Sequence, residues 1–164
     1  MVETDTGAAR PKLEARDAEA LLYDYASCID QGEMERWPTL FARAGSYELV
    51  PAENDAGGLP VALMFCRDRA MIEDRATAIM HANIYSPHTY RHLYGNLRVT
   101  VGADSAILQC NYAVYRTDQE GVSDCFSVGR VEATVVVEEG SLRFARMRVV
   151  YDTATVRGLL VLPI

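Results

Sequence analysis

Residues 68–101 read DRAMIEDRATAIMHANIYSPHTYRHLYGNLRVTV, and this stretch decides the fold. Its first half has the period of a helix, because steps of three and four place on one face Met71, Ile72, Arg75, Ala78 and Ile79. Asp68 is a suitable N-cap for that helix. Pro87 favours an extended conformation in the residue before it, and from Tyr90 the pattern is that of a strand. The stretch therefore predicts a helix, a crossing segment and the first long strand of a sheet.

The chain before this stretch is predicted to be mainly helical. The strongest helix pattern covers residues 13–31, which present one apolar stripe and are followed by Gly32 as a stop. The segment 34–41 is expected to be a short helix or, because Pro38 fits a first-turn position better than an interior one, two short turns. The other elements expected before residue 68 are a short strand at 46–50, a loop at 52–60 and a second short strand at 61–66. Residues 1–12 are polar and predict a flexible N-terminal arm. We therefore expect one domain, spanning 13–164.

The chain after the central helix is predicted to be mostly sheet. Four long segments of strand composition, separated by short turns, lie at 93–101, 105–117, 125–137 and 142–151. Short turns join antiparallel neighbours, so the four strands form a meander. The apolar residues of the last strand change phase midway, which predicts a bulge. The chain ends in GLLVLPI, and such an apolar tail has to be buried against its own core or against a partner.

Helices followed by a long antiparallel sheet are the order of an α+β fold. A strongly curved sheet wrapped around the first helix is the economical way to bury both. The result is a cone, an architecture that serves either as a pocket enzyme or as an assembly module.

Composition argues against several functions. The chain has 164 residues and a formal net charge of −7, and no basic tail offsets that charge, which disfavours binding to nucleic acid or to an anionic membrane. No apolar run approaches the ~20 residues of a membrane span, and the N-terminus lacks the apolar core of a signal peptide. A cytoplasmic location is expected. The cysteines, Cys28, Cys66, Cys110 and Cys125, form no CxxC pair and are expected to be reduced, with a disulfide or zinc set as the alternative.

The histidines are the first candidates for a site. His88 and His92 have the spacing H-x3-H, which on a helix binds a metal. Pro87 and the strand pattern argue against a helix here, and in a strand the two side chains lie roughly 13 Å apart, too far to share one ion. A pocket enzyme would instead need an acid or base at the floor of the cone. Its candidates are Tyr25, Asp30, Tyr47, His88, His92 and Tyr112. No P-loop, dinucleotide-binding, nucleophile-elbow or HExxH motif is present.

Arginines surround the tyrosine-rich central stretch, at Arg67, Arg69, Arg75, Arg91 and Arg98. One interpretation is a set of solvated, ion-paired surface residues. The other is a partner surface, because Arg and Tyr are favoured at interfaces.

A family resemblance sharpens these alternatives. The run A-N-I-Y-x-P-H-x-Y-R-H-L from Ala82 to Leu93, with D-R-x-x-A before it, is similar to the small (β) subunits of aromatic-ring-hydroxylating dioxygenases. The segment E-R-W-P-T-L-F at 35–41, V-V-Y-D-T at 149–153 and the ending L-P-I resemble them too. The resemblance runs from about residue 13 to the end. It is strongest to the branch that acts on aromatic carboxylates such as benzoate, anthranilate and terephthalate.

The resemblance implies a cystatin-like, NTF2-like cone without catalytic, cofactor-binding or metal-binding residues of its own. In such enzymes the partner α subunit holds a Rieske [2Fe–2S] cluster and a mononuclear iron, and a reductase supplies electrons from NADH. The usual assembly is an α3β3 hexamer on a trimeric base of β subunits. Arg75, Tyr90 and Arg91 would then be structural or interface residues. The sequence itself has no Cys/His set for a Rieske centre and no convincing two-His-one-carboxylate set.

Two functions remain to be separated. The first is a non-catalytic β subunit, whose α partner inserts both atoms of O2 into an aromatic ring. It predicts a large interface and a cone filled by side chains. The alternative is a stand-alone NTF2-like dehydratase or isomerase, which predicts an open, dry pocket with a titratable pair inside. A plain oligomerising scaffold unrelated to dioxygenases is a third.

Overall fold

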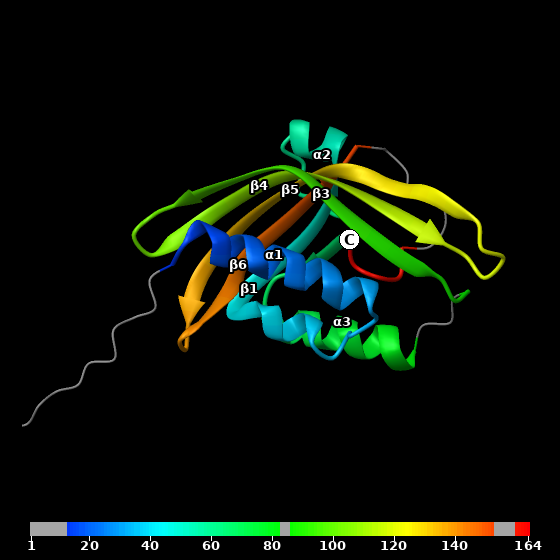
Figure 1. Cartoon of the computed structure of the whole chain (residues 1–164), viewed down its shortest axis with the longest axis horizontal. Coiled ribbons are helices and arrows are strands. Elements are labelled where there is room, and N and C mark those ends of the chain that lie inside the picture. Colours follow the sequence, from blue (N-terminus) through cyan, green and yellow to red (C-terminus); the bar gives the residue numbers. More distant parts are fainter. Residues whose placement is uncertain (1–12, 83–85, 153–159) are drawn as a thin grey trace, which may run out of the picture.

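The computed structural model describes residues 13–82, 86–152 and 160–164. A strongly curved sheet arches over two helices, and a third, short helix lies on the outer side of the arch (Figure 1). The helices are α1 (Ala15–Asp30), α2 (Ala52–Ala56) and α3 (Arg69–His81), with a 3-10 turn at Trp37–Leu40. The strands are β1 (Phe41–Pro51), β2 (Met64–Cys66), β3 (Thr89–Val101), β4 (Ser105–Thr117), β5 (Ser123–Glu138) and β6 (Ser141–Tyr151). The predicted α+β cone is confirmed.

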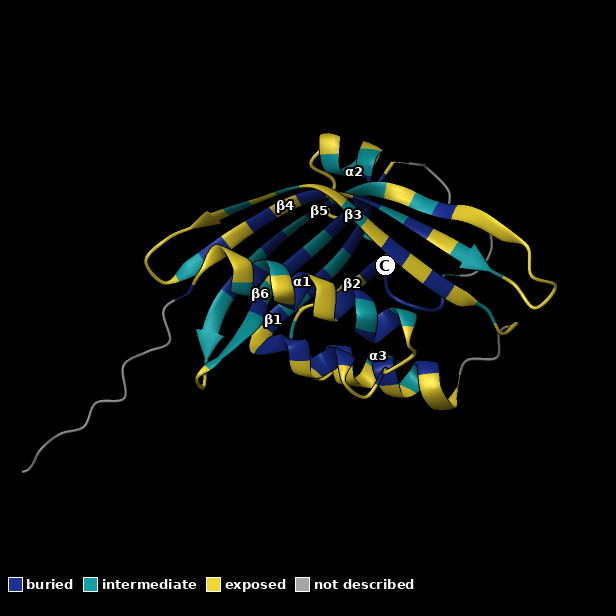
Figure 2. Cartoon of the chain, viewed as in Figure 1, coloured by how far each residue is buried: buried dark blue, intermediate teal, exposed yellow. Residues whose placement is uncertain are grey.

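The sheet has the order β2-β1-β6-β5-β4-β3. Strands β3 to β6 form the predicted antiparallel meander, while β1 runs parallel to β6 and antiparallel to β2. The strands β2 and β3 are therefore the two edges. Buried residues alternate with exposed or intermediate ones along most of β4 and the middle of β5 (Figure 2). The buried residues of the strands belong to the same core as those of α1 and α3. The concave side holds the core.

Irregular positions occur in several strands of the sheet. In β6 the register with β5 shifts between Arg146 and Phe144, so the predicted bulge is confirmed. The register of β3 also shifts, next to Asn96, whose φ is 55°. At Gly129 of β5 the neighbouring strand approaches so closely that a Cβ would lie 2.0 Å from the carbonyl oxygen of Val150. Bulges bend strands and increase their twist, which is consistent with the curvature of the sheet.

Both long helices are positioned as their sequences predict. The apolar stripe of α1 is buried and packs against β3, β4 and β6. The carboxylate of Asp68 accepts a hydrogen bond from the backbone N–H of Met71 at 3.0 Å and so caps α3. Below the sheet, Trp37 and Phe41 pack edge to face, with ring centroids 6.2 Å apart. No helix in the described part of the chain is long and apolar enough to span a membrane.

Three local predictions were wrong. The expected loop at 52–60 contains α2, which Pro51 precedes in an extended conformation and Gly57 ends. The expected strand at 46–50 extends to Phe41–Pro51, because it pairs with β6 along its length. The expected strand at 61–66 is a strand only at Met64–Cys66. Of the two possibilities for 34–41, the structure has the two short turns, a turn at 34–36 followed by the 3-10 turn. The arm at 1–12 and part of the tail, 153–159, lie outside the described residues.

Candidate functional site

The end of the chain occupies the concave side of the sheet. It lies between the strands and the helices (Figure 1), and its side chains Val161, Leu162 and Ile164 are 7%, 7% and 2% exposed. The expectation that the apolar tail is buried against its own core is confirmed for residues 160–164. The position where a pocket enzyme of this architecture would bind its substrate is thus filled by the chain itself.

Polar groups at the floor of the cone bind the main chain of this tail. The hydroxyl of Tyr25 donates to the carbonyl oxygen of Ile164 at 2.8 Å. The hydroxyl of Tyr47 donates to the same oxygen at 3.1 Å and accepts from the N–H of Ile164 at 3.0 Å. The guanidinium of Arg75 donates to the carbonyl oxygen of Val161 at 3.2 Å. These contacts hold the tail by its backbone, while its side chains fill the apolar space around it.

These contacts remove two of the predicted acid–base candidates. Burial raises the pKa of Tyr47 to about 12 and raises the pKa of Tyr25 well above its ordinary value. Both hydroxyls are therefore neutral near pH 7, and both are engaged with the tail. Each is a structural hydrogen-bonding group in this chain.

Asp30 and His92 form a second contact between candidates, apart from Tyr25 and Tyr47. Asp30 is the last residue of α1, and His92 lies in β3. The ring Nδ1 of His92 donates to the carboxylate at 2.6 Å, and its backbone N–H donates to the two carboxylate oxygens at 3.2 and 3.0 Å. The side chains are 0% (His92) and 8% (Asp30) exposed. The ring Nε2 of His92 is buried and has no hydrogen-bond partner among the residues that the structure describes. These hydrogen bonds join the end of α1 to β3, and we call the pair Asp30 and His92 the latch.

The remaining candidates lie apart from this pair. The hydroxyl of Tyr112 shares a hydrogen bond with the hydroxyl of Ser127 at 2.9 Å, and burial raises its pKa. The ring of His88 lies before β3, with Nδ1 2.8 Å from the carbonyl oxygen of Ser86. His88 and Asp30 both line a hollow of about 420 Å³ between the ends of α1 and α3. Tyr25 and Tyr47 bind the tail, Asp30 and His92 bind each other, Tyr112 binds Ser127 across β4 and β5, and His88 lines the hollow. These candidates do not surround one position where a substrate could react.

Metal ligands do not assemble either. Within 13–82, 86–152 and 160–164 no group of three or more His, Cys, Asp or Glu side chains could hold a metal ion. His88 and His92 take part in different contacts, as the strand spacing predicts. The described cysteines are free thiols, with Cys125 exposed and the others buried.

The arginines of the central stretch do not share one surface. Arg67 and Arg69 form ion pairs with neighbours on their own segment, Arg67 with Asp68 and Arg69 with Glu73. Arg75 turns inward to the tail. Arg91 and Arg98 are exposed on β3. The five side chains therefore do not form one cluster, and a partner surface that includes the exposed Arg91 and Arg98 stays a prediction.

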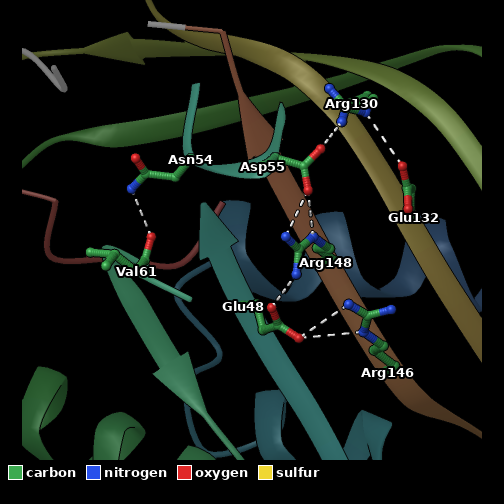
Figure 3. Close-up of polar contacts among 8 residues, drawn as sticks. All are labelled: Glu48, Asn54, Asp55, Val61, Arg130, Glu132, Arg146 and Arg148. Carbon is green, nitrogen blue, oxygen red and sulfur yellow. Dashed lines mark hydrogen bonds and ion pairs between the residues drawn. The ribbon is translucent and has the colours of Figure 1, made fainter. Parts of the chain in front are cut away.

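A network of charged residues on the outer face of the sheet was missed by the sequence analysis. Asp55 of α2 lies between Arg130 of β5 and Arg148 of β6 (Figure 3). Glu48 of β1 bridges Arg148 and Arg146. The pKa of Asp55 is lowered, chiefly because Arg148 donates hydrogen bonds to it. The sequence did contain a signal for this network, because Arg146 and Arg148 are two residues apart in one predicted strand and so lie on the same face of the sheet. The network fastens α2 to the sheet from outside.

Comparison with known proteins agrees with this geometry. A SnoaL-like domain model matches residues 11–148. The anthranilate 1,2-dioxygenase small subunit of Burkholderia cepacia is 40% identical over 141 residues, which cover 85% of this chain and 88% of that protein. The β 1 subunit of the terminal oxygenase component of terephthalate 1,2-dioxygenase from Comamonas sp is 30% identical, covering 85% of this chain and 92% of the relative.

Solved structures give the same result. A protein from Novosphingobium aromaticivorans assigned as the β subunit of an aromatic-ring-hydroxylating dioxygenase superposes with a TM-score of 0.81 at 31% identity, covering 91% of this chain and 95% of the other. An NTF2-like protein with a cystatin-like fold from the same genus and species superposes with a TM-score of 0.61 at 19% identity, covering 85% and 82%, and shows the fold alone. This chain belongs to the SnoaL-like family and, within it, to the small (β) subunits of aromatic-ring-hydroxylating dioxygenases.

Proposed function

We propose that this chain is a non-catalytic β subunit that assembles with, and supports, the catalytic α subunit of a Rieske-type dioxygenase acting on an aromatic carboxylate. The observation that carries the proposal is the 40% identity with the anthranilate 1,2-dioxygenase small subunit over nearly the full length of both chains. The filled cone supports it independently. A subunit that supports a partner has no need of an open pocket.

The finer parts of the proposal concern the assembly. Residues 13–164 act as one domain, three copies form a base, and three catalytic subunits complete an α3β3 hexamer. The Rieske cluster and the mononuclear iron belong to the catalytic subunit, which receives electrons from NADH through a reductase and inserts both atoms of O2 into the ring. This chain contributes no cofactor ligand. The cytoplasmic location expected from the sequence stays a prediction.

The dehydratase or isomerase alternative has one observation in its favour, the contact between Asp30 and His92. A carboxylate that orients an imidazole is a common arrangement in acid–base catalysis. Here, however, the carboxylate also binds the backbone N–H of His92, and residues 160–164 fill the cone. The pair is therefore better explained as a structural contact.

Co-expression with a Rieske catalytic subunit of an anthranilate-type dioxygenase tests the proposal. The two chains should co-purify as a brown complex of defined mass, with iron in equal amount whether or not the β chain carries the substitution Asp30→Asn. The isolated β chain should be colourless and should not turn over an aromatic carboxylate. A β chain that stays separate from the catalytic subunit, or that catalyses hydration or isomerisation alone, would contradict the proposal.

A further inference from the structure

One group of exposed apolar side chains lies along the β2 edge of the sheet. Leu59, Val61, Leu63 and Phe65 are 53%, 61%, 52% and 53% exposed. Phe65 lies in β2, and the other three lie in the segment that leads from α2 into this strand. Among the described strands, β2 pairs with β1 alone and forms one edge of the sheet. We call these four residues the edge patch.

A second group lies on the outer face near the opposite edge. Leu93, Tyr115 and Val128 are 53%, 43% and 38% exposed. Strand register brings them together, because Leu93 and Val128 both lie opposite Ala113, and Tyr115 lies opposite both Arg91 and Cys125. We call Leu93, Tyr115, Val128, Arg91 and Cys125 the face patch. It combines Tyr, Arg and aliphatic surface, the composition found at interface centres.

Exposed charges of opposite sign lie at the two patches. The short helix α2 directly precedes the edge patch and is joined to it where the side chain of Asn54 donates to the carbonyl oxygen of Val61 at 2.9 Å (Figure 3). On this helix, Glu53 is exposed and has no ion-pair partner in the described ranges. In the face patch, the Arg91 side chain is 71% exposed, and the carboxylate nearest to it, 3.9 Å away on Asp30, is already bound by His92.

We propose that the edge patch of one copy of this chain packs on the face patch of the next copy. A contact between the two unlike patches can bring Glu53 of one copy to Arg91 of the next, which pairs opposite charges. Unlike patches on opposite edges form a head-to-tail interface, which closes into a ring when the rotation permits. This inference rests on the proposed role in assembly and assigns the surfaces that join the β subunits.

Disulfide trapping in the co-expressed α–β complex tests the contact directly. The variant Leu63→Cys places a thiol in the edge patch, and the native Cys125 supplies one in the face patch, while the other cysteines are buried. Mild oxidation should give covalently linked β chains up to the closed ring. The products should vanish in L63C/C125S. The control Ile107→Cys, at an exposed position outside both patches, should give none.

A charge exchange tests the same contact without a cross-link. Glu53→Lys and Arg91→Glu should each weaken association of the β chains by about five- to tenfold, and the double variant should restore it. Cross-linking that persists in L63C/C125S would show a like-with-like contact and overturn the inference. Absence of cross-links in an intact α–β complex would also overturn it and would leave the edge patch to the catalytic subunit. Failure of the chains to co-purify would instead refute the proposed function.

Discussion

Removal of the Asp30 carboxylate should cost this chain much of its stability. In Asp30→Ala the backbone N–H of His92 and the ring Nδ1 of the same residue lose their acceptor. The His92 side chain is 0% exposed, so water does not replace the lost partner without local opening. Each buried polar group that is left without a partner costs about 1–3 kcal/mol, and Asp30→Ala leaves two such groups.

We therefore expect the free energy of unfolding to fall by about 4 kcal/mol, a large part of the ~5–15 kcal/mol of a typical domain. With a urea m-value of about 2 kcal/mol/M, the unfolding midpoint should drop by about 2 M. Circular dichroism during urea titration measures this shift. Asp30→Asn, which keeps one acceptor oxygen, should show a smaller loss.

The matched control is Asp24→Ala on the same helix. Asp24 is 57% exposed and forms an ion pair with Arg36 at 3.4 Å. An exposed pair of this kind is worth at most about 1 kcal/mol, so the midpoint should move by no more than ~0.5 M. If Asp30→Ala is as stable as Asp24→Ala, the latch between α1 and β3 contributes nothing, and the account of this contact is refuted.

Further predictions concern backbone packing and the thiols. Gly129→Ala should lower the free energy of unfolding by about 2–3 kcal/mol, because a Cβ at this position meets the carbonyl oxygen of Val150. Gly95→Ala is the control and should change the free energy of unfolding little, because a Cβ there has no atom within 4 Å. Urea titration compares the two variants. A thiol reagent at pH 8 should modify Cys125 in the native chain and the three buried cysteines only after unfolding, as a timed mass measurement would show. Stability should also fall between pH 9 and pH 11. Burial raises the pKa of the Cys28 thiol from 9.0 to about 11 in the folded chain. The thiol therefore ionises at lower pH in the unfolded chain, and the stabilisation present below pH 9 is lost as the pH rises towards 11. Cys28→Ala should reduce this loss of stability.

The parts of the fold that sequence predicted well depend on local signals. The strand at 105–117 matches β4 residue for residue, because turns bound it on both sides. The cap by Asp68 and the bulge in β6 were also visible in short windows of sequence. Each of these features is encoded by neighbouring residues, through side-chain period, turn composition or a single polar cap.

The parts that were missed depend on partners far along the chain. The true length of β1 is set by its pairing with β6, about a hundred residues later. The helix α2 is held from outside by Arg130 and Arg148, which no window around residue 55 contains. The latch joins residues 62 positions apart. Composition alone gives no sign of which distant residue will complete such a contact.

The residues that fill the concave side of the sheet bear on whether this cone is an assembly subunit or a pocket enzyme. A stand-alone enzyme would have to expel residues 160–164 before a substrate could reach Tyr25 or Tyr47. Expulsion would expose Val161, Leu162 and Ile164 and would cost about 4.5–9 kcal/mol, at about 1.5–3 kcal/mol for each side chain. An open state at that free energy binds substrate at least about a thousandfold more weakly than a preformed pocket. The buried tail therefore argues against a substrate site on the concave side. Under the proposed function, the contacts of the subunit lie on the outside, where the edge and face patches and the exposed charges of Glu53 and Arg91 are found.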